Sequence, residues 1–131
     1  MRIDKIEGVF DFNVACVFAG KFSGYLPGNF WNRLYRKDIE RLIFYFENHM
    51  QTLASRSAIS SAGYMPLECG MQIECLEGEA IDWSDGHFSM RVLFNCGSPD
   101  GESSNVSFGF ETIVDFVDLN RFCDELRRFV A

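Results

Sequence analysis

The sequence predicts a single α+β domain over residues 1–131, in which two helices pack on a mostly antiparallel sheet of about five to six strands. Apolar and polar side chains alternate in several segments, which is typical of strands, whereas apolar residues recur at steps of three and four in two others, which is typical of helices. Turn-forming pairs such as Asp85-Gly86 separate the alternating segments. The predicted order of elements is β-β-α-β-β-β-β-α.

The first part of the chain predicts two strands. Residues 9–18 alternate in character, with Phe10 and Phe12 on the face opposite Asp11. Residues 25–35 predict a turn that enters a short second strand. The first of these strands is therefore expected to bury one face.

A helix is predicted over residues 38–55, because apolar residues there recur at steps of three and four. Asp38 lies near its start, where a carboxylate is favourable beside the positive end of the helix dipole. His49 falls on the rear half of the helix, and a surface or boundary position is expected for it. The predicted buried positions are Ile39, Leu42, Ile43, Phe46, Met50 and Leu53.

The rest of the chain predicts an antiparallel meander that ends in a second helix. Alternation begins at Met71, a hairpin turn is predicted at residues 84–86, and the returning strand alternates from Phe88 onward. After a loop, Phe108 and Phe110 are expected to lie on one face of a strand in the interior of the sheet. The last helix is expected to start near Asp118 and to bury Leu119, Phe122, Cys123, Leu126 and Phe129.

The charge of the chain is distributed unevenly. The net charge is −7, but residues 57–120 hold eleven acids and a single base, Arg91, which gives that segment a net charge of −10. Such a block argues against a surface that binds nucleic-acid phosphates. It favours either a basic partner or solubility.

The cysteines and the absence of a targeting signal indicate the compartment. Five cysteines is an odd number, and they lie without a repeated short spacing, so free thiols are expected rather than a disulfide framework. No signal peptide and no apolar run of about 20 residues is recognised, so no membrane association is expected. The sequence therefore predicts a soluble, cytoplasmic protein.

Residues 69–89 combine thiols, a histidine and carboxylates, so a metal site or an active site has to be considered. Cys69, Cys75, His87 and Cys96 lack the paired spacing of structural zinc ligands, and no metal or cofactor is predicted. Neither histidine lies in a motif with a serine or cysteine nucleophile, and there is no glycine-rich phosphate loop. The chain is therefore predicted not to be an enzyme.

The same segment predicts an acidic surface that contains an aromatic side chain. Clustered carboxylates beside a tryptophan are the groups expected to meet a lysine- or arginine-rich protein surface. The alternative is that Trp83 belongs to the core and that the acids only keep the protein soluble. The predicted partner-binding residues are Glu77, Glu79, Asp82, Trp83 and Asp85, together with Asp100 and Glu102 of a second acidic loop.

Four segments in order resemble a known family: "DIERLIFYF" (38–46), "LEGEA" (76–80), "VSFGFET" (106–112) and "DLNRFCDEL" (118–126). Their order is similar to that in the small cytoplasmic immunity proteins encoded beside bacterial polymorphic toxins, including those of contact-dependent growth inhibition. The likeness covers roughly residues 38–130, and its motifs are structural, so it assigns no site residue.

The resemblance implies that the chain binds and blocks the toxin domain of its own system, without nucleic acid or membrane as a partner. Toxins of such systems include nucleases with basic clefts, which an acidic protein can fill. The alternative is a metal- or small-ligand-binding domain that uses Cys69, Cys75, His87 and the nearby acids.

Overall fold

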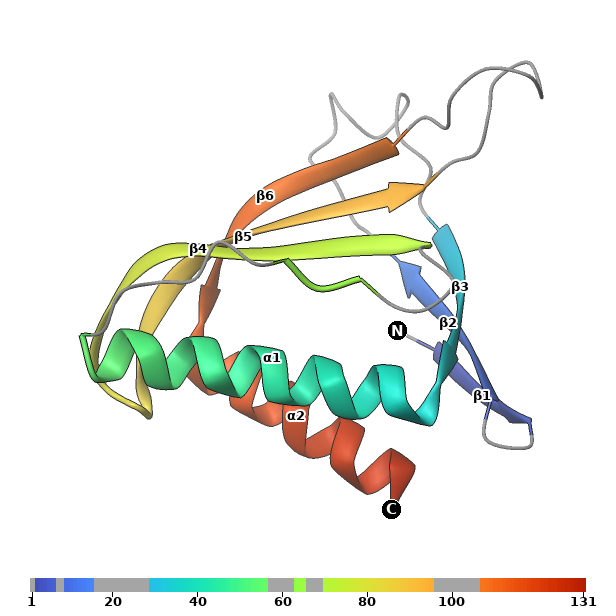
Figure 1. Ribbon diagram of the computed structural model, residues 1–131, viewed down its shortest axis with the longest axis horizontal. Helices are drawn as coiled ribbons and strands as arrows, with labels where there is room; N and C mark the ends of the chain where they lie inside the picture. The colour runs from blue at the N-terminus through green and yellow to red at the C-terminus, as the bar shows by residue number, and fades with distance from the viewer. Residues whose placement is uncertain (1, 7–8, 16–28, 57–62, 66–69, 96–106) are drawn as a thin grey trace.

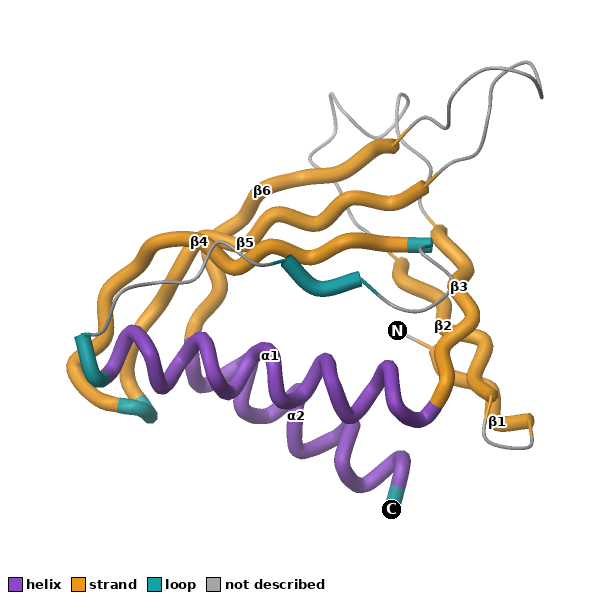
Figure 2. The backbone as a smooth tube through the Cα atoms, viewed as in Figure 1, coloured by secondary structure: helices purple, strands orange, loops and turns teal. Residues whose placement is uncertain are grey.

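Two antiparallel sheets and two helices make up the part of the chain that the computed structural model describes (Figures 1 and 2). The described residues are 2–6, 9–15, 29–56, 63–65, 70–95 and 107–131. One sheet has the order β1-β2-β3 and the other β4-β5-β6, and the helices cover one face of the second sheet. The elements are β1 (Arg2–Ile6), β2 (Val9–Ala15), β3 (Asn29–Tyr35), α1 (Arg36–Ala54), β4 (Met71–Asp82), β5 (Asp85–Asn95), β6 (Ser107–Asp115) and α2 (Phe116–Val130).

The α+β class with two helices is confirmed, whereas the predicted order and the single sheet are not. Among the described residues, three strands precede α1 instead of two, and three instead of four lie between the helices. Strand β1 was missed because its two isoleucines, Ile3 and Ile6, lie three residues apart and do not alternate. The six strands then divide into two separate sheets.

Helix α1 buries the apolar face that its sequence predicts. All six predicted positions are buried, and the helix begins at Arg36. Asp38, in the first turn, is only 2% exposed, and its Oδ2 accepts the Tyr35 backbone N–H at 2.9 Å. Its Oδ1 forms an ion pair with Arg41 at 3.2 Å, and its backbone carbonyl accepts the Tyr64 hydroxyl at 2.7 Å. These bonds satisfy a carboxylate and a helix start that would be costly to bury unpaired.

Helix α2 begins at Phe116, two residues before the predicted start. The Asp115 side chain caps it by accepting the Val117 N–H at 2.7 Å, so the carboxylate that precedes the helix marks its true beginning. Phe122 and Phe129 pack against the core, as predicted, but are only partly buried. The buried residues of the helix are Phe116, Leu119, Cys123, Leu126 and Val130.

The β4-β5-β6 sheet presents one face to the helices and the other to solvent. On β5, Phe88, Val92 and Phe94 are buried, as their alternation predicts. Strand β6 lies at the edge of the sheet that the described residues form. Phe108 on this strand is 41% exposed, so the prediction that it lies in the interior is wrong. Phe110 is half-buried, with its ring 6.5 Å from that of Phe94.

A β-bulge changes which residues of β4 face the helices. Cys75 pairs with Met90 and Gly78 pairs with Phe88, so β4 advances by three residues while β5 advances by two. Before the bulge the odd-numbered residues point inward, and after it the even-numbered ones do. Glu77 and Glu79 consequently face solvent.

The β1-β2-β3 sheet lies beside the N-terminal end of α1 and the C-terminal end of α2 (Figure 1). Phe10 on β2 is fully buried, and its ring meets that of Phe129 edge-on at 5.1 Å. The Arg36 side chain donates to the carbonyl of Val130, which links the start of α1 to the end of α2. This end of the molecule lies opposite the β4–β5 hairpin.

Two cysteines lie in the described part of the chain, and both are buried free thiols. Burial raises the pKa of Cys75 to about 12 and that of Cys123 to about 11, so both thiols stay protonated and unreactive at neutral pH. Cys16, Cys69 and Cys96 lie outside the described residues. Neither α1 nor α2 has the length and apolar character needed to cross a membrane, and no other helix occurs in the described ranges.

Candidate functional site

The tip of the β4–β5 hairpin is a two-residue turn made by Trp83 and Ser84. Asp82 pairs with Asp85 across the strands, so the turn predicted at residues 84–86 lies slightly earlier in the chain. The Asp82 carboxylate accepts the Ser84 backbone N–H at 2.8 Å and the Ser84 hydroxyl at 2.7 Å. Gly86 lies within β5, where a Cβ would come within 2.7 Å of the Glu79 carbonyl oxygen. Its role is therefore close strand approach rather than turn formation.

The hairpin carries four exposed carboxylates, those of Glu77, Glu79, Asp82 and Asp85. Hydrogen bonds from the Ser84 hydroxyl and backbone lower the pKa of Asp82, so its carboxylate is charged at neutral pH. All four were predicted as partner-binding residues from the sequence. The second predicted acidic group, Asp100 and Glu102, lies outside the described residues.

The single base of this acidic half is already paired. Arg91 lies on the solvent face of β5, between Glu74 of β4 and Glu111 of β6, with nitrogen–oxygen distances of 3.5 and 3.1 Å. The three side chains form one row across the sheet, in agreement with the strand register. Arg91 therefore compensates its two neighbours and leaves the hairpin carboxylates without a cation on the described part of this face.

Trp83 stands out from the hairpin into solvent. Its side chain is 69% exposed and that of the neighbouring Ile81 is 79% exposed, so the interpretation of Trp83 as a core residue is wrong. All five residues of the hairpin tip, 81–85, are exposed, so the exposure of Trp83 is a property of the whole tip. Large apolar side chains with this exposure mark candidate interaction sites when they lie among charged groups.

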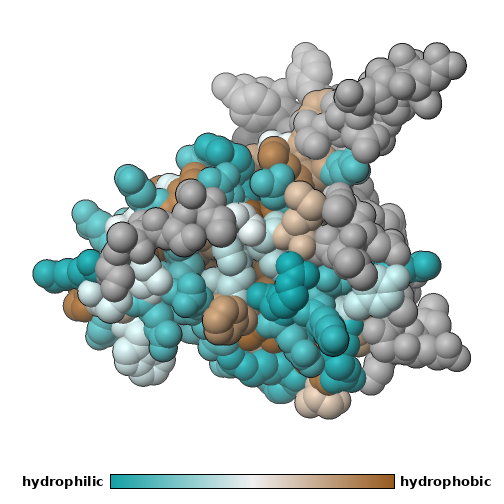
Figure 3. Space-filling view, viewed as in Figure 1, coloured by the Kyte–Doolittle hydropathy of each residue, from teal (hydrophilic) through white to brown (hydrophobic). Residues whose placement is uncertain are grey.

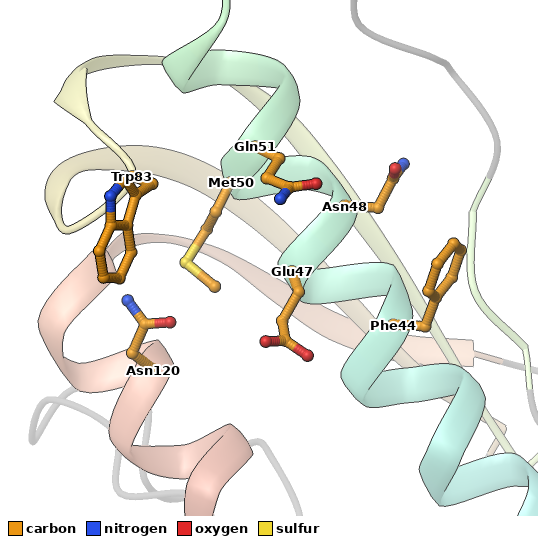
Figure 4. Close-up of a pocket in the computed structure, with 7 residues that line it drawn as sticks. All are labelled: Phe44, Glu47, Asn48, Met50, Gln51, Trp83 and Asn120. Carbon is orange, nitrogen blue, oxygen red and sulfur yellow. The ribbon is translucent and has the colours of Figure 1, made fainter.

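The indole of Trp83 leans toward the helices and borders a groove (Figure 4). A hollow of about 310 Å³ lies between Trp83, the exposed side of α1 and Asn120 of α2. A second hollow of about 550 Å³ lies between the hairpin tip and the C-terminal end of α1, and it shares Asn48, Gln51 and Trp83 with the first. We call these two hollows together the Trp83 groove.

Sequence reasoning missed the residues that complete this groove. Asn48 and Gln51 lie on the polar side of α1, and Asn120 comes from a helix that is distant in sequence. One signal was available, because Phe44 falls outside the buried stripe of α1 and is 71% exposed. An aromatic residue on the polar side of an amphipathic helix is unusual and could have pointed to this surface.

The buried side chain of His49 connects α1 to the base of the β4–β5 hairpin. Contrary to the predicted surface or boundary position, it is 6% exposed, and its Nε2 lies 2.8 Å from the Leu76 carbonyl oxygen at the bulge. Its ring meets that of Phe88 edge-on, with centroids 4.6 Å apart. Because a carbonyl only accepts, Nε2 carries the hydrogen in this bond. The bond satisfies a bulge carbonyl and anchors the base of the hairpin.

We expect the stability of the protein to fall in mild acid through His49. Burial lowers the pKa of His49 below 6.5, so the unfolded chain takes up a proton at a pH where the folded chain does not. The free energy of unfolding should therefore decrease as the pH falls from about 6.5 through the lowered pKa. Urea titrations between pH 7.5 and 5 measure it, and the non-titrating His49→Gln variant should lose this part of the pH dependence. The same slope in both proteins would contradict the assignment.

The positions of Cys75 and His87 do not favour the alternative in which these side chains bind a metal ion together. Cys75 is buried on the helix side of the sheet, whereas His87 is exposed on the solvent side, so these two side chains point away from each other. Within the described ranges, no group of three or more histidine, cysteine, aspartate or glutamate side chains is arranged to hold a metal ion. Cys69 and Cys96, the other two residues of that hypothesis, lie outside these ranges.

No family model matches the sequence, and no curated protein or solved structure is similar to it by the comparisons made. The likeness to immunity proteins therefore remains a resemblance of segment order. The geometry of the hairpin and the groove carries the functional argument.

Proposed function

We propose that this chain is an inhibitor that binds a basic protein domain through the β4–β5 hairpin, and that it acts as an immunity protein against a bacterial toxin domain. The observation that supports this most is the exposed Trp83 among exposed carboxylates at the hairpin tip. An aromatic anchor beside uncompensated charge is the pattern of an energetically important centre in a protein interface. The resemblance of segment order supplies the class of partner.

The carboxylates would act mainly in bringing the partner to the surface. The segment 57–120 carries a net charge of −10, and its base, Arg91, lies paired away from the hairpin tip. The electric field of this negative segment accelerates association with a basic partner, and salt reduces the acceleration by screening the charges. If the partner is a nuclease, the same carboxylates can occupy its cleft in place of nucleic-acid phosphates.

The exposed aromatic residue would act mainly in holding the partner. A tryptophan buries a large rigid area at little cost in side-chain entropy, and truncation of such an anchor in an interface lowers binding by about 2 kcal/mol or more. On the face seen in Figure 3, hydrophilic side chains dominate the described surface, and the hydrophobic patches are small and separate. The hairpin tip is accordingly the proposed centre of the interface.

Replacing Asp82 and Asp85 by asparagine tests the electrostatic part of the proposal. The double variant should keep its circular dichroism spectrum and its urea midpoint, because both side chains are exposed. Its association rate with the toxin domain should fall, and the remaining rate should depend less on salt. Stopped-flow mixing at 50 and 300 mM salt measures this.

A matched control separates the position of the charge from its amount. Glu40→Gln with Glu125→Gln removes two exposed carboxylates, one near the start of α1 and one in the second half of α2, and neither lines the hollows beside the hairpin tip. This control variant should associate with the toxin domain at almost the same rate as the unmodified chain. Equal effects of the two double variants, or no effect of the hairpin variant, would remove the hairpin from the proposed interface.

The biological role is tested by growth. The gene that adjoins this one should encode a toxin domain, and cells that express that domain should survive only when this chain is co-expressed. The proposed place of action is the cytoplasm, where the toxin would reach its target. A neighbouring gene without a toxin domain, or no rescue by a well-expressed chain, would overturn the proposed immunity role.

A further inference from the structure

The Trp83 groove has walls from three elements that the fold brings together. The hairpin contributes Trp83, α1 contributes Asn48 and Gln51, and α2 contributes Asn120 (Figure 4). Met50, which is 3% exposed, forms part of the floor. The groove is thus framed by a buried core residue, two helices and a short hairpin turn.

The walls offer hydrogen-bond acceptors and negative charge. The side-chain amides of Asn48, Gln51 and Asn120 each carry one acceptor oxygen, and Glu47 and Asp82 add carboxylates. Among the described residues, no lysine or arginine lines either hollow. Arg127, about two turns beyond Asn120 on α2, forms an ion pair with Glu47. Asp82 is then the lining carboxylate without a cationic partner among the described contacts.

Trp83 adds a flat, electron-rich surface to these acceptors. The face of an indole attracts cations, and among aromatic side chains tryptophan attracts them most strongly. A carboxylate beside it reinforces the attraction and disfavours an anion. A purely apolar ligand would leave the amides and the carboxylate without partners, which is costly. The chemistry of the walls therefore selects a cation with many donors.

We propose that the Trp83 groove binds one arginine side chain of a basic segment, with the guanidinium stacked on the indole of Trp83 and bonded to Asp82 and to amide oxygens of α1. Arginine fits better than lysine, because its planar guanidinium stacks on an aromatic face and presents five donors in a fork. This inference rests on the proposed function only for the source of the arginine, which would be the partner protein. The binding chemistry can be tested without that partner.

The probe is the capped peptide acetyl-Gly-Arg-Gly-amide, compared with the same peptide that carries citrulline or lysine in place of arginine. Citrulline keeps the shape of arginine but lacks its charge. Titration of the 15N-labelled full chain should shift the indole N–H resonance of Trp83 and the side-chain amides of Asn48 and Gln51. The indole N–H resonance of the second tryptophan of the chain, Trp31, is recorded in the same spectra. We expect a dissociation constant on the order of 1 mM for arginine, and at least about tenfold weaker binding for citrulline.

Two variants locate the binding in the groove. Trp83→Ala should lower the affinity for the arginine peptide at least about tenfold, as measured from the side-chain amide resonances of Asn48 and Gln51. Trp83→Phe should retain part of this affinity. Gln51→Lys places a cation in the groove and should abolish binding. The matched control Thr112→Lys adds the same charge at an exposed position of β6 and should leave binding nearly unchanged.

The outcomes separate this inference from the proposed function. Equal shifts with arginine and citrulline peptides, or unchanged binding in well-folded Trp83→Ala, would overturn the arginine site even if a toxin domain binds the chain. Arginine-selective binding that depends on Trp83 supports the site. If that binding is found but the adjacent gene encodes no toxin domain, the immunity role fails and the arginine site stands.

Discussion

Replacing Phe88 by alanine should lower the free energy of unfolding by about 3–5 kcal/mol. Phe88 is fully buried at the middle of the sheet, and its ring contacts those of His49 of α1 and Phe116 of α2, with centroid distances of 4.6 and 6.1 Å. Truncation removes the apolar area that the ring buries and leaves a cavity between both helices and the sheet. The effect is large because three elements meet at this one side chain.

Urea titration with fluorescence or circular dichroism measures this loss, and Phe44→Ala is the matched control. Phe44 is 71% exposed on α1, so the same substitution there should change stability by no more than about 0.5 kcal/mol. A loss below about 1 kcal/mol for Phe88→Ala would show that the ring is not at the centre of the core. The edge-strand residue Phe110, which sequence reasoning placed in the interior, should give an intermediate loss because it is half-buried.

Gly78→Ala should destabilise the protein by about 3 kcal/mol, at the upper end of the usual cost of overpacking. Gly78 lies directly opposite Phe88 at the bulge of β4. An added Cβ would overlap the His87 carbonyl oxygen and lie 2.5 Å from the Phe88 Cα. These are backbone atoms of a paired strand, so β5 must move, and with it the Phe88 ring that both helices pack against.

Gly63→Ala provides the comparison for this substitution. Its added Cβ would meet the Ile73 carbonyl oxygen at 3.3 Å, a contact that a small local shift relieves. Thermal and urea unfolding of the two variants should therefore differ widely, although the chemical change is the same. Similar stabilities of Gly78→Ala and Gly63→Ala would mean that β4 and β5 approach less closely than their pairing indicates.

The helices were predictable because their signal is local. The apolar residues from Ile39 to Leu53 recur every three or four residues. This pattern is visible within the segment itself, whichever apolar surface the helix packs against. The strand β5 was predictable for the same reason, since Phe88, Val92 and Phe94 alternate within one segment. Local periodicity thus predicted the helices and the central strand.

The pairing of the strands was less predictable because it depends on partners that are distant in sequence. The bulge at Leu76 and Glu77 changes the inward face of β4 without changing its composition. The position of β6 at the sheet edge, which exposes Phe108, follows from topology rather than from its own residues. The division of the strands into two sheets has the same origin.

The candidate site divides in the same way. The carboxylates of the hairpin and Trp83 could be identified by composition, because they lie within nine residues of each other. The amides of Asn48, Gln51 and Asn120 could not, because they are ordinary polar residues until α1, α2 and the hairpin meet. His49 was misplaced because its partner, the Leu76 carbonyl, exists only where the bulge presents it.

The two-residue turn at Trp83 and Ser84 has a consequence for how the proposed interface could be altered. The contacts of His49 and Gly78 lie at the base of the hairpin. The side chains of residues 81–85 are all exposed, and the hydrogen bonds from Ser84 to Asp82 stay within the tip. The exposed tip, which is the centre of the proposed interface, is therefore separate from the residues that hold the base of the hairpin. Substitutions at its exposed positions should cost little stability, which makes the tip a natural place to diversify in a combinatorial library aimed at new basic partners.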